Sequence, residues 1–578
     1  MIFCVSAFIE NFNVDIFFFI IYNKITIKEV IDMKRIISVI LSLMLILSCG
    51  GITVFAAGTQ GIAESAGSSL TKGFYDTLNV VVEKLVSMIC KIYPNPADWQ
   101  SLADYDSEEV GFLAGRDTYQ TEAADGAYWS LGYASRSILP EDVDEGKYNL
   151  GRDLMNKIAE GVYDDQRIRV AVIDDNSGEG AVVLGAIDAL GVTSTDTRSI
   201  RKAVLAYCEE QGIKVASINI SATHAHSALD TQGVSTEFFK KLLLGFAYNA
   251  MGNTDSLPSM ENADYFKEYF VAQSVEAVKD ALADMESGKL YFDEIDFSEF
   301  IHDKRDLIAK EDVPATAALY FVPDSGSEAT YITDITCHAT SFSASNGLVG
   351  SDYIYYMDQY IKEQTGANLV MVPGAVGQMS RDIEVDTTGM TEWEDMGASA
   401  KALGTEFAKL VLAADFSEEL SPVLNATHKE IFITPENSIL VLACEIRLVN
   451  NKVFLDSNGN ALMPSEMGYV EFGNRFALAL FPAELYPEVF WDDEITNGTT
   501  WDDATWDYDC LGDAVDGVAI YPVSITNDAL GYVLTDNNFA FMGHIIGDEI
   551  ADEVLSVGKH MGSFLVEEYY DMLESYVK

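Results

Sequence analysis

The sequence predicts an α/β fold, in which one large domain carries helices packed on mixed β-sheets. From about residue 120, short apolar runs typical of buried strands alternate with segments whose apolar residues recur at helical spacing. The 578-residue chain is 48% hydrophobic, which is enough to bury a large core. No repeat or low-complexity tract divides it, so these elements are expected to share one domain.

The first predicted elements are a hairpin and a helix. Residues 167–173 and 181–187 are apolar runs separated by a turn-forming segment that ends at Gly178. A helix is expected from about Thr195, where several capping residues lie, to Gly212, which can adopt the left-handed conformation that ends helices. The further expected elements are strand 215–220, helix 265–285, strand 331–336, helix 352–363 capped by Ser351, strands 369–372, 476–481 and 518–523, and a helical tail from about 547.

The first 56 residues are predicted to be an export signal. Met33-Lys34-Arg35 supplies positive charge, an apolar run covers 36–55, and Ala56 offers a small residue for cleavage. We expect Met33 to be the initiator; a retained membrane anchor and a lipid-modified Cys49 are the alternatives. Residues 57–117 are expected to form a helical extension and 118–578 the main domain. The protein is expected to be secreted or associated with the cell surface, without a stable transmembrane anchor after cleavage.

The charge balance excludes one class of partner. The chain has 36 Lys and Arg against 91 Asp and Glu, a formal net charge of -55. Such an acidic surface repels phosphate backbones, so we expect no nucleic-acid binding. The seven cysteines include no CxxC pair, which argues against a thiolate zinc site or a disulfide framework.

Histidines follow two of the predicted strands in a chain with only seven of them. His224 and His226 come just after strand 215–220, and residues two apart in an extended segment face the same side. His338 follows strand 331–336, and Glu484 follows strand 476–481. Imidazoles and a carboxylate at strand ends can hold a catalytic zinc ion that keeps one position open for water. An exposed loop, a core histidine and a helix-terminal acid are the alternative interpretations.

Several segments together resemble the neutral/alkaline ceramidase family. Thr223-His224-Ala225-His226-Ser227 is similar to the family's THTHSGP motif, and His338 stands in its H-x-T-S context. The segment from Gly374 to Ser380 resembles GAAGDxSP, the one from Phe481 to Glu484 resembles a PGE motif, and the one from Asn527 to Tyr532 resembles N-x-x-x-G-Y. Together with Ser135 to Pro140, which loosely matches the family's opening segment, they occur in family order over roughly residues 120–570.

The resemblance implies a ceramidase-like catalytic domain that hydrolyses the amide bond of an N-acyl lipid, ceramide by default. The expected partner is accordingly a small-molecule or lipid substrate. The implied zinc ligands are His224, His338, Glu484 and Tyr532. In the same comparison His226 would transfer a proton, while Ser380 and Arg305 would lie on the substrate side. The chemistry is coherent because zinc activates water for attack on an amide carbonyl.

Departures from the family pattern lie mainly on the substrate side. Ala228-Leu229 replaces a Gly-Pro pair, Gln378 replaces an aspartate, and Arg381 replaces a proline. The family's C-terminal immunoglobulin-like domain is expected to be absent. Two alternatives therefore stay open: a zinc hydrolase of a different amide or ester, and a non-catalytic binding protein of the same fold. Serine-hydrolase chemistry is disfavoured because no GxSxG segment occurs.

Overall fold

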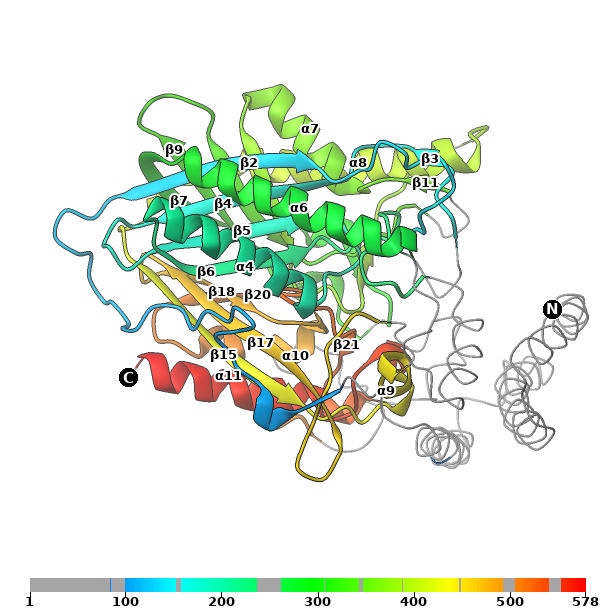
Figure 1. Cartoon of the computed structure of the whole chain (residues 1–578). Helices are drawn as coiled ribbons and strands as arrows, with labels where there is room; N and C mark the ends of the chain where they lie inside the picture. Colours follow the sequence, from blue (N-terminus) through cyan, green and yellow to red (C-terminus); the bar gives the residue numbers. More distant parts are fainter. Residues whose placement is uncertain are drawn as a thin grey trace, which may run out of the picture. The chain divides into compact units, whose positions relative to one another are not determined.

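Two large β-sheets form the centre of the protein (Figure 1). The computed structural model describes Lys84 and residues 99–151, 157–235, 261–305, 307–342, 347–386, 388–445, 449–491, 505–539 and 552–577. All of these except Lys84 belong to one compact unit, built from Ser87–Phe541 and Asp552–Lys578. The predicted export signal lies outside the described residues, and so does the predicted helical extension before residue 99, apart from Lys84.

The larger sheet has nine strands. In spatial order they are β12 (Asn368–Pro373), β10 (Thr330–Ile335), β9 (Thr316–Pro323), β7 (Glu286–Ile295), β2 (Trp129–Ser137), β4 (Arg167–Asp174), β5 (Ala181–Ile187) and β6 (Val215–Ala222), with β14 (Glu418–Glu419) beside β7. Two neighbouring pairs, β5–β6 and β10–β12, are parallel. Each is joined through a helix, as a parallel crossover requires: α4 (Ser194–Gln211) in the first and α7 (Tyr353–Thr365) in the second.

The second sheet has six strands. They are β1 (Gln100–Ser101), β16 (Phe454–Leu455), β17 (Ala461–Phe472), β18 (Phe476–Leu480) and β20 (Ala519–Val523), with β15 (Leu424–Ile433) also paired to β17. Shorter elements complete the fold: β3 (Gly161–Val162), β8 (Ile301–Asp303), β11 (Leu348–Val349), β13 (Met379–Arg381), β19 (Glu484–Leu485), β21 (Tyr532–Val533), α9 (Ser438–Glu445) and α10 (Pro487–Trp491).

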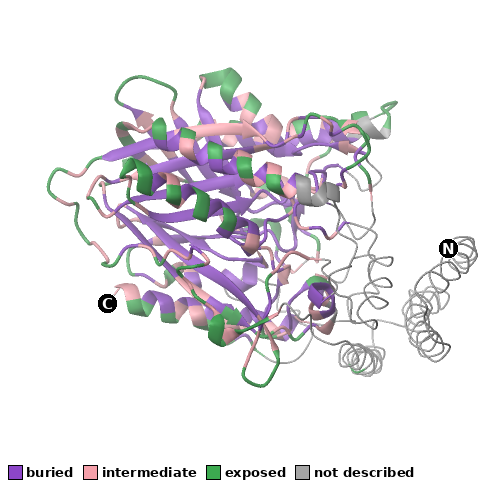
Figure 2. Ribbon diagram, in the orientation of Figure 1, coloured by how far each residue is buried: buried purple, intermediate pink, exposed green. Residues whose placement is uncertain are grey.

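The sheets pack face to face, and helices cover their outer faces. Ala171 and Ile173 of β4 enter a core shared with Val470 and Phe472 of β17, whereas Val170, the alternate residue, packs into the core beneath α4 and α6 (Glu261–Ala283). Helices α7 and α8 (Glu392–Ala413) cover β9, β10 and β12, and α11 (Met561–Val577) covers the second sheet. Strands buried on both faces explain the unbroken apolar runs in the sequence (Figure 2).

The α/β prediction is confirmed, and so are most predicted elements. Strands β4, β5, β6, β10, β12, β18 and β20 lie where they were expected, and helix α4 ends at Gly212 with φ 69°. The predicted cap of α7 was wrong by one residue. Asp352, not Ser351, is the N-cap, and its carboxylate accepts the Tyr353 N–H at 2.7 Å.

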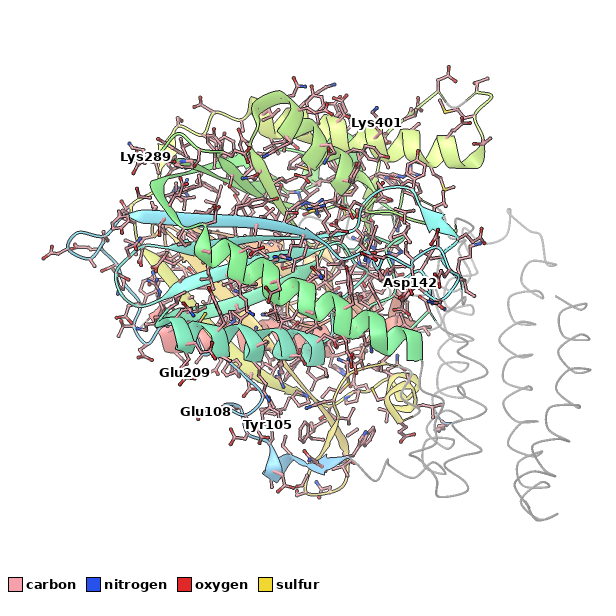
Figure 3. The ribbon with its side chains drawn as sticks, turned by 45° about the horizontal axis from the view of Figure 1, so that its top comes forward. Tyr105, Glu108, Asp142, Glu209, Lys289 and Lys401 are labelled. Atoms are coloured by element: carbon pink, nitrogen blue, oxygen red, sulfur yellow. The ribbon has the colours of Figure 1, made fainter. Side chains whose placement is uncertain are left out.

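The segment before residue 117 is attached to both sheets. Buried Arg116 donates to Asp175 at 2.9 Å and to the Gly180 carbonyl at 2.7 Å. Tyr105, labelled in Figure 3, donates to Glu430 of β15. The division between an extension and a main domain at residue 117 stays a prediction. Among the described residues, no helix combines the length and apolarity that crossing a membrane requires.

Candidate metal centre

Three histidines meet where the segments after β6 and β10 run side by side. Ala225 and Ala339 form an isolated parallel bridge, and the His226 N–H donates to the Ala339 carbonyl at 3.1 Å. This bridge brings His224 and His226 next to His338, so that one ring nitrogen from each lies within 4.8 Å of the others. The expectation that strand ends would bring these histidines together is confirmed in this geometry.

The segments that follow β18 and β20 supply a carboxylate and a phenol to the same place. Glu484 begins β19 and Tyr532 begins β21, and these two residues are partners in a parallel pair. Glu484 Oε2 lies 3.0 Å from His224 Nε2 and 3.6 Å from His338 Nε2. The rings of Tyr532 and His338 are stacked, with centroids 6.4 Å apart.

A backbone seam holds the two sheets together beside these residues. Ser221 and Thr526 form an antiparallel bridge, and the Asn527 N–H donates to the Ile220 carbonyl at 2.8 Å. The Asn527 side chain accepts the Ile220 N–H at 3.0 Å and donates to Asn219 and Glu466. Because Asn527 has φ 64°, a conformation that asparagine tolerates better than most residues, this residue type suits the seam.

Backbone carbonyls fix the orientation of two imidazoles. His224 Nδ1 donates to the Leu190 carbonyl at 2.9 Å, and His338 Nδ1 donates to the Met379 carbonyl at 3.0 Å. With the proton on Nδ1, each neutral ring has its lone pair on Nε2, which points towards Glu484. Carbonyl contacts of this kind are typical of metal-binding histidines.

The converging atoms are acceptors that have no donor. His338 Nε2 and Glu484 Oε2 are buried without a hydrogen-bond partner. His224 Nε2 lies 3.0 Å from Glu484 Oε2, but with the His224 proton on Nδ1 it has no hydrogen to donate. Buried polar atoms are normally paired, and leaving one unpaired costs about 1–3 kcal/mol. A cation among them would satisfy these atoms, and two or three imidazoles with one carboxylate form a donor set that suits zinc.

The protonation states also suit a metal. Burial, together with Lys304, lowers the pKa of His338 to about 4, so this ring is neutral near pH 7. Burial alone would raise the pKa of Glu484, but His224 and His338 lower it to about 2. Burial and Glu484 hold the pKa of Tyr532 well above its usual range, so the phenol keeps its proton.

His224 has a strained backbone, with φ 61°. The neighbouring residues are fixed on both sides, because Thr223 N–H donates to Ile187 O at 2.9 Å and Ala225 N–H donates to Ala189 O at 3.1 Å. A non-glycine residue in the left-handed region costs roughly 1–3 kcal/mol, and such residues cluster at functional sites. His224 Nε2 lies 3.0 Å from His226 Nε2.

A buried ion pair supports this loop, and the sequence analysis missed it. Arg169 Nη1 donates to both carboxylate oxygens of Asp188 at 2.9 Å. Asp188 comes just before the loop that supplies the Leu190 carbonyl, and it accepts the Arg167 N–H at 3.0 Å. The available signal was Arg169 itself, a charged residue within an apolar strand.

The structure places the other two predicted residues less directly. Arg305 follows β8 and pairs with Asp552 at 3.4 Å and Glu553 at 3.3 Å, while its guanidinium lies 4.9 Å from the centre of the Tyr486 ring. Ser380 is buried on β13, next to the residue whose carbonyl holds His338. The roles of Arg305 and Ser380 on the substrate side stay predictions.

Comparison with known proteins places this geometry in a known fold. No protein-family model matches the chain, and no curated protein matches it. Among solved structures, the neutral ceramidase from Pseudomonas aeruginosa matches with a TM-score of 0.56 and 14% identity, over 78% of this chain and 74% of that one. A structure described as a ceramidase complexed with C2 matches with a TM-score of 0.53 and 15% identity, over 77% and 75%. The protein therefore shares its fold with neutral ceramidases.

Proposed function

We propose that this protein is a zinc-dependent hydrolase that cleaves the amide bond of an N-acyl lipid, with ceramide as the default substrate. The observation that carries the proposal is the convergence of His224, His338 and Glu484, in which His338 Nε2 and Glu484 Oε2 are buried acceptors without donors. The ceramidase-like fold supports the choice of reaction. In this proposal the zinc ligands are His224, His338, Glu484 and Tyr532.

Each residue around this centre has a separate role in the proposed reaction. A zinc ion in this position would supply activation of a water molecule and polarisation of the amide carbonyl. His226, which is partly exposed, would take a proton from the attacking water on Nε2 and return it to the leaving nitrogen. Leu190 and Met379 keep the ring orientations through their carbonyl groups. Ser380 and Arg305 are proposed to contact the substrate near the scissile bond.

A second candidate is a zinc hydrolase of a different amide or ester. The observation that favours it is the engagement of Arg305 by two carboxylates, Asp552 and Glu553, which reduces the positive charge available to a substrate. Gln378, in place of an acid, also changes this side of the site. We further propose that the protein is exported, on the basis of the apolar segment that follows Met33.

The test combines metal content with turnover. We expect about one zinc per chain, as for a mononuclear catalytic site, and chelator-sensitive release of the acyl group from a fluorescent short-chain N-acyl-sphingosine. His224→Ala should lose both zinc and activity, whereas His226→Ala should keep zinc and lose most turnover. Wild-type activity in His224→Ala would refute the proposed metal centre. Loss of zinc in His226→Ala would show that the roles assigned to His224 and His226 must be exchanged. Zinc without turnover of this substrate would favour the second candidate.

A further inference from the structure

Gln378 and Glu488 form a buried polar pair behind the metal centre. Gln378 Nε2 donates to Glu488 Oε2 at 3.1 Å, and each side chain is 1% exposed. The second oxygen of each group, Gln378 Oε1 and Glu488 Oε1, is buried without a hydrogen-bond partner. With Glu488 ionised, two acceptors would be unpaired in the interior, one of them carrying charge. Such an arrangement is strongly unfavourable.

One proton removes the conflict. We propose that Glu488 is held as a neutral carboxylic acid whose Oε1–H donates to Gln378 Oε1, so that acid and amide form a cyclic pair of two hydrogen bonds. A protonated carboxyl offers one donor and one acceptor, and a primary amide offers the same complement. The pair therefore satisfies both orphaned oxygens without a further ligand.

The surroundings favour the neutral form. Burial and the Asp303 carboxylate together raise the pKa of Glu488 to about 7 from its ordinary 4.5, against the opposing effects of its backbone N–H, Arg305 and Asn538. Arg305 is itself shared with Asp552 and Glu553. The charge facing Glu488 is thus mainly negative, which disfavours a further carboxylate.

The pair joins the two segments that carry metal-site residues. Gln378 lies next to Met379, whose carbonyl holds His338, and the preceding Gly377 N–H donates to the Leu485 carbonyl at 2.7 Å. Glu488 lies on α10, four residues after Glu484. Gln378 and Glu488 are therefore positioning residues that lock these two segments together. This consequence for the metal rests on the proposed function, whereas the pair itself does not.

The sign of the pH dependence follows from the direction of the shift. Because the folded-state pKa of Glu488 lies above the ordinary value, the folded protein binds more protons than the unfolded chain between pH 4.5 and about 7. The stabilisation is complete below pH 4.5 and is lost as pH rises through about 7. The difference between the folded-state pKa and the ordinary pKa of Glu488 corresponds to a fall of about 300-fold in the folding equilibrium constant across this pH range.

The deciding experiment uses the full chain in chelator, without substrate, so that its outcome is independent of hydrolase activity. The wild-type minus Glu488→Gln infrared difference spectrum at pH 6 should contain the carbonyl band of a protonated carboxylic acid. A difference spectrum is needed because burial also raises the pKa of Asp334 and of Glu445 to about 8, and these acids contribute equally to both proteins. Glu488→Gln should keep two hydrogen bonds as an amide–amide pair, fold normally and lose the stability change between pH 4.5 and 7. Gln378→Leu should be destabilised across the whole range, and the exposed control Glu419→Gln should behave as wild type.

Zinc retention then tests the positioning role. Above pH 7 wild-type protein should release zinc more readily than Glu488→Gln, in which the pair cannot ionise. If the difference spectrum contains no acid band, the proposal is wrong. An unchanged stability profile in a folded Glu488→Gln variant would also overturn it. If that variant does not fold, the wild-type minus Gln378→Leu difference spectrum decides, since loss of the amide partner must shift the acid band if Glu488 carries the proton.

Discussion

Replacing Glu484 by glutamine should strengthen the metal-free protein and weaken zinc binding. In the metal-free state His338 Nε2 and Glu484 Oε2 are buried acceptors without donors. The glutamine amide has nearly the same shape but brings N–H donors to the ring nitrogens of His224 and His338, which lie 3.0 Å and 3.6 Å from Oε2. Pairing one orphaned acceptor should raise the free energy of unfolding by about 1–3 kcal/mol in chelator.

With excess zinc, wild-type protein should have a higher free energy of unfolding than Glu484→Gln. Glutamine lacks the negative charge that a zinc carboxylate ligand supplies. If the affinity falls by about 100-fold, the zinc-linked stabilisation at fixed zinc falls by about 2.7 kcal/mol. Urea unfolding followed by tryptophan fluorescence, with chelator and with excess zinc, measures both differences, and metal analysis of the dialysed protein gives occupancy. Glu436→Gln, at an exposed carboxylate that pairs with His560, is the control and should change neither quantity.

The opposite result in chelator would refute this reasoning. If Glu484→Gln is less stable than wild type without metal, Glu484 is held there by a protonated His224, and the cluster is an ion pair rather than a set of unpaired acceptors. Equal zinc occupancy in the two proteins would separately remove Glu484 from the ligands and leave His224, His226 and His338 as the metal group.

Three further substitutions test the buried contacts that support the fold around the site. Arg201→Met should lower the free energy of unfolding by about 3–5 kcal/mol, measured in urea, because it leaves the Glu466 carboxylate buried and unpaired. Burial lowers the pKa of His428 to about 4, so its stabilisation, present above pH 6.5, should be lost as pH falls towards 4; His428→Gln should remove about 3 kcal/mol of this acid sensitivity in unfolding curves between these values. Gly374→Ala should cost about 1–3 kcal/mol in thermal or urea unfolding, because the added methyl would overlap the Thr336 hydroxyl; an unchanged stability would show that this loop can shift.

Local sequence signals account for the elements that could be predicted. Strands β4 and β5 have apolar runs bounded by a turn, and α4 ends at a glycine that adopts φ 69°. Strand β17 was not predicted, because Glu466 and Glu471 interrupt its apolar pattern. These acids are paired with residues distant in sequence, Arg201 for the first and Tyr119 and Asn425 for the second. Such compensation depends on tertiary structure and leaves no local trace.

In the candidate site, too, some features have a local sequence signal and others depend on tertiary contacts. The histidines could be predicted to converge because each follows an apolar strand, and strand ends meet at the edge of a sheet. The carbonyls of Leu190 and Met379, which orient two of the rings, carry no sequence signature, since every residue has one. The partners of Arg305 lie about 250 residues further along the chain, so its ion pairs could be found only in the folded structure.

The hydrogen bonds between protein groups around the site form a frame, and we infer that this frame, and not the metal, fixes the positions of the proposed ligands. The Ala225–Ala339 bridge, the seam at Asn527 and the β19–β21 pair are made by backbone and amide groups, none of which is a proposed zinc ligand. A rigid frame explains how two acceptors stay unpaired in the interior, since neither can rotate away to find a donor. Zinc should therefore bind to a folded protein with preformed ligands, unlike small zinc domains that fold only on binding metal. Chelation should accordingly abolish activity without unfolding the chain, and added zinc should restore the activity without a refolding step.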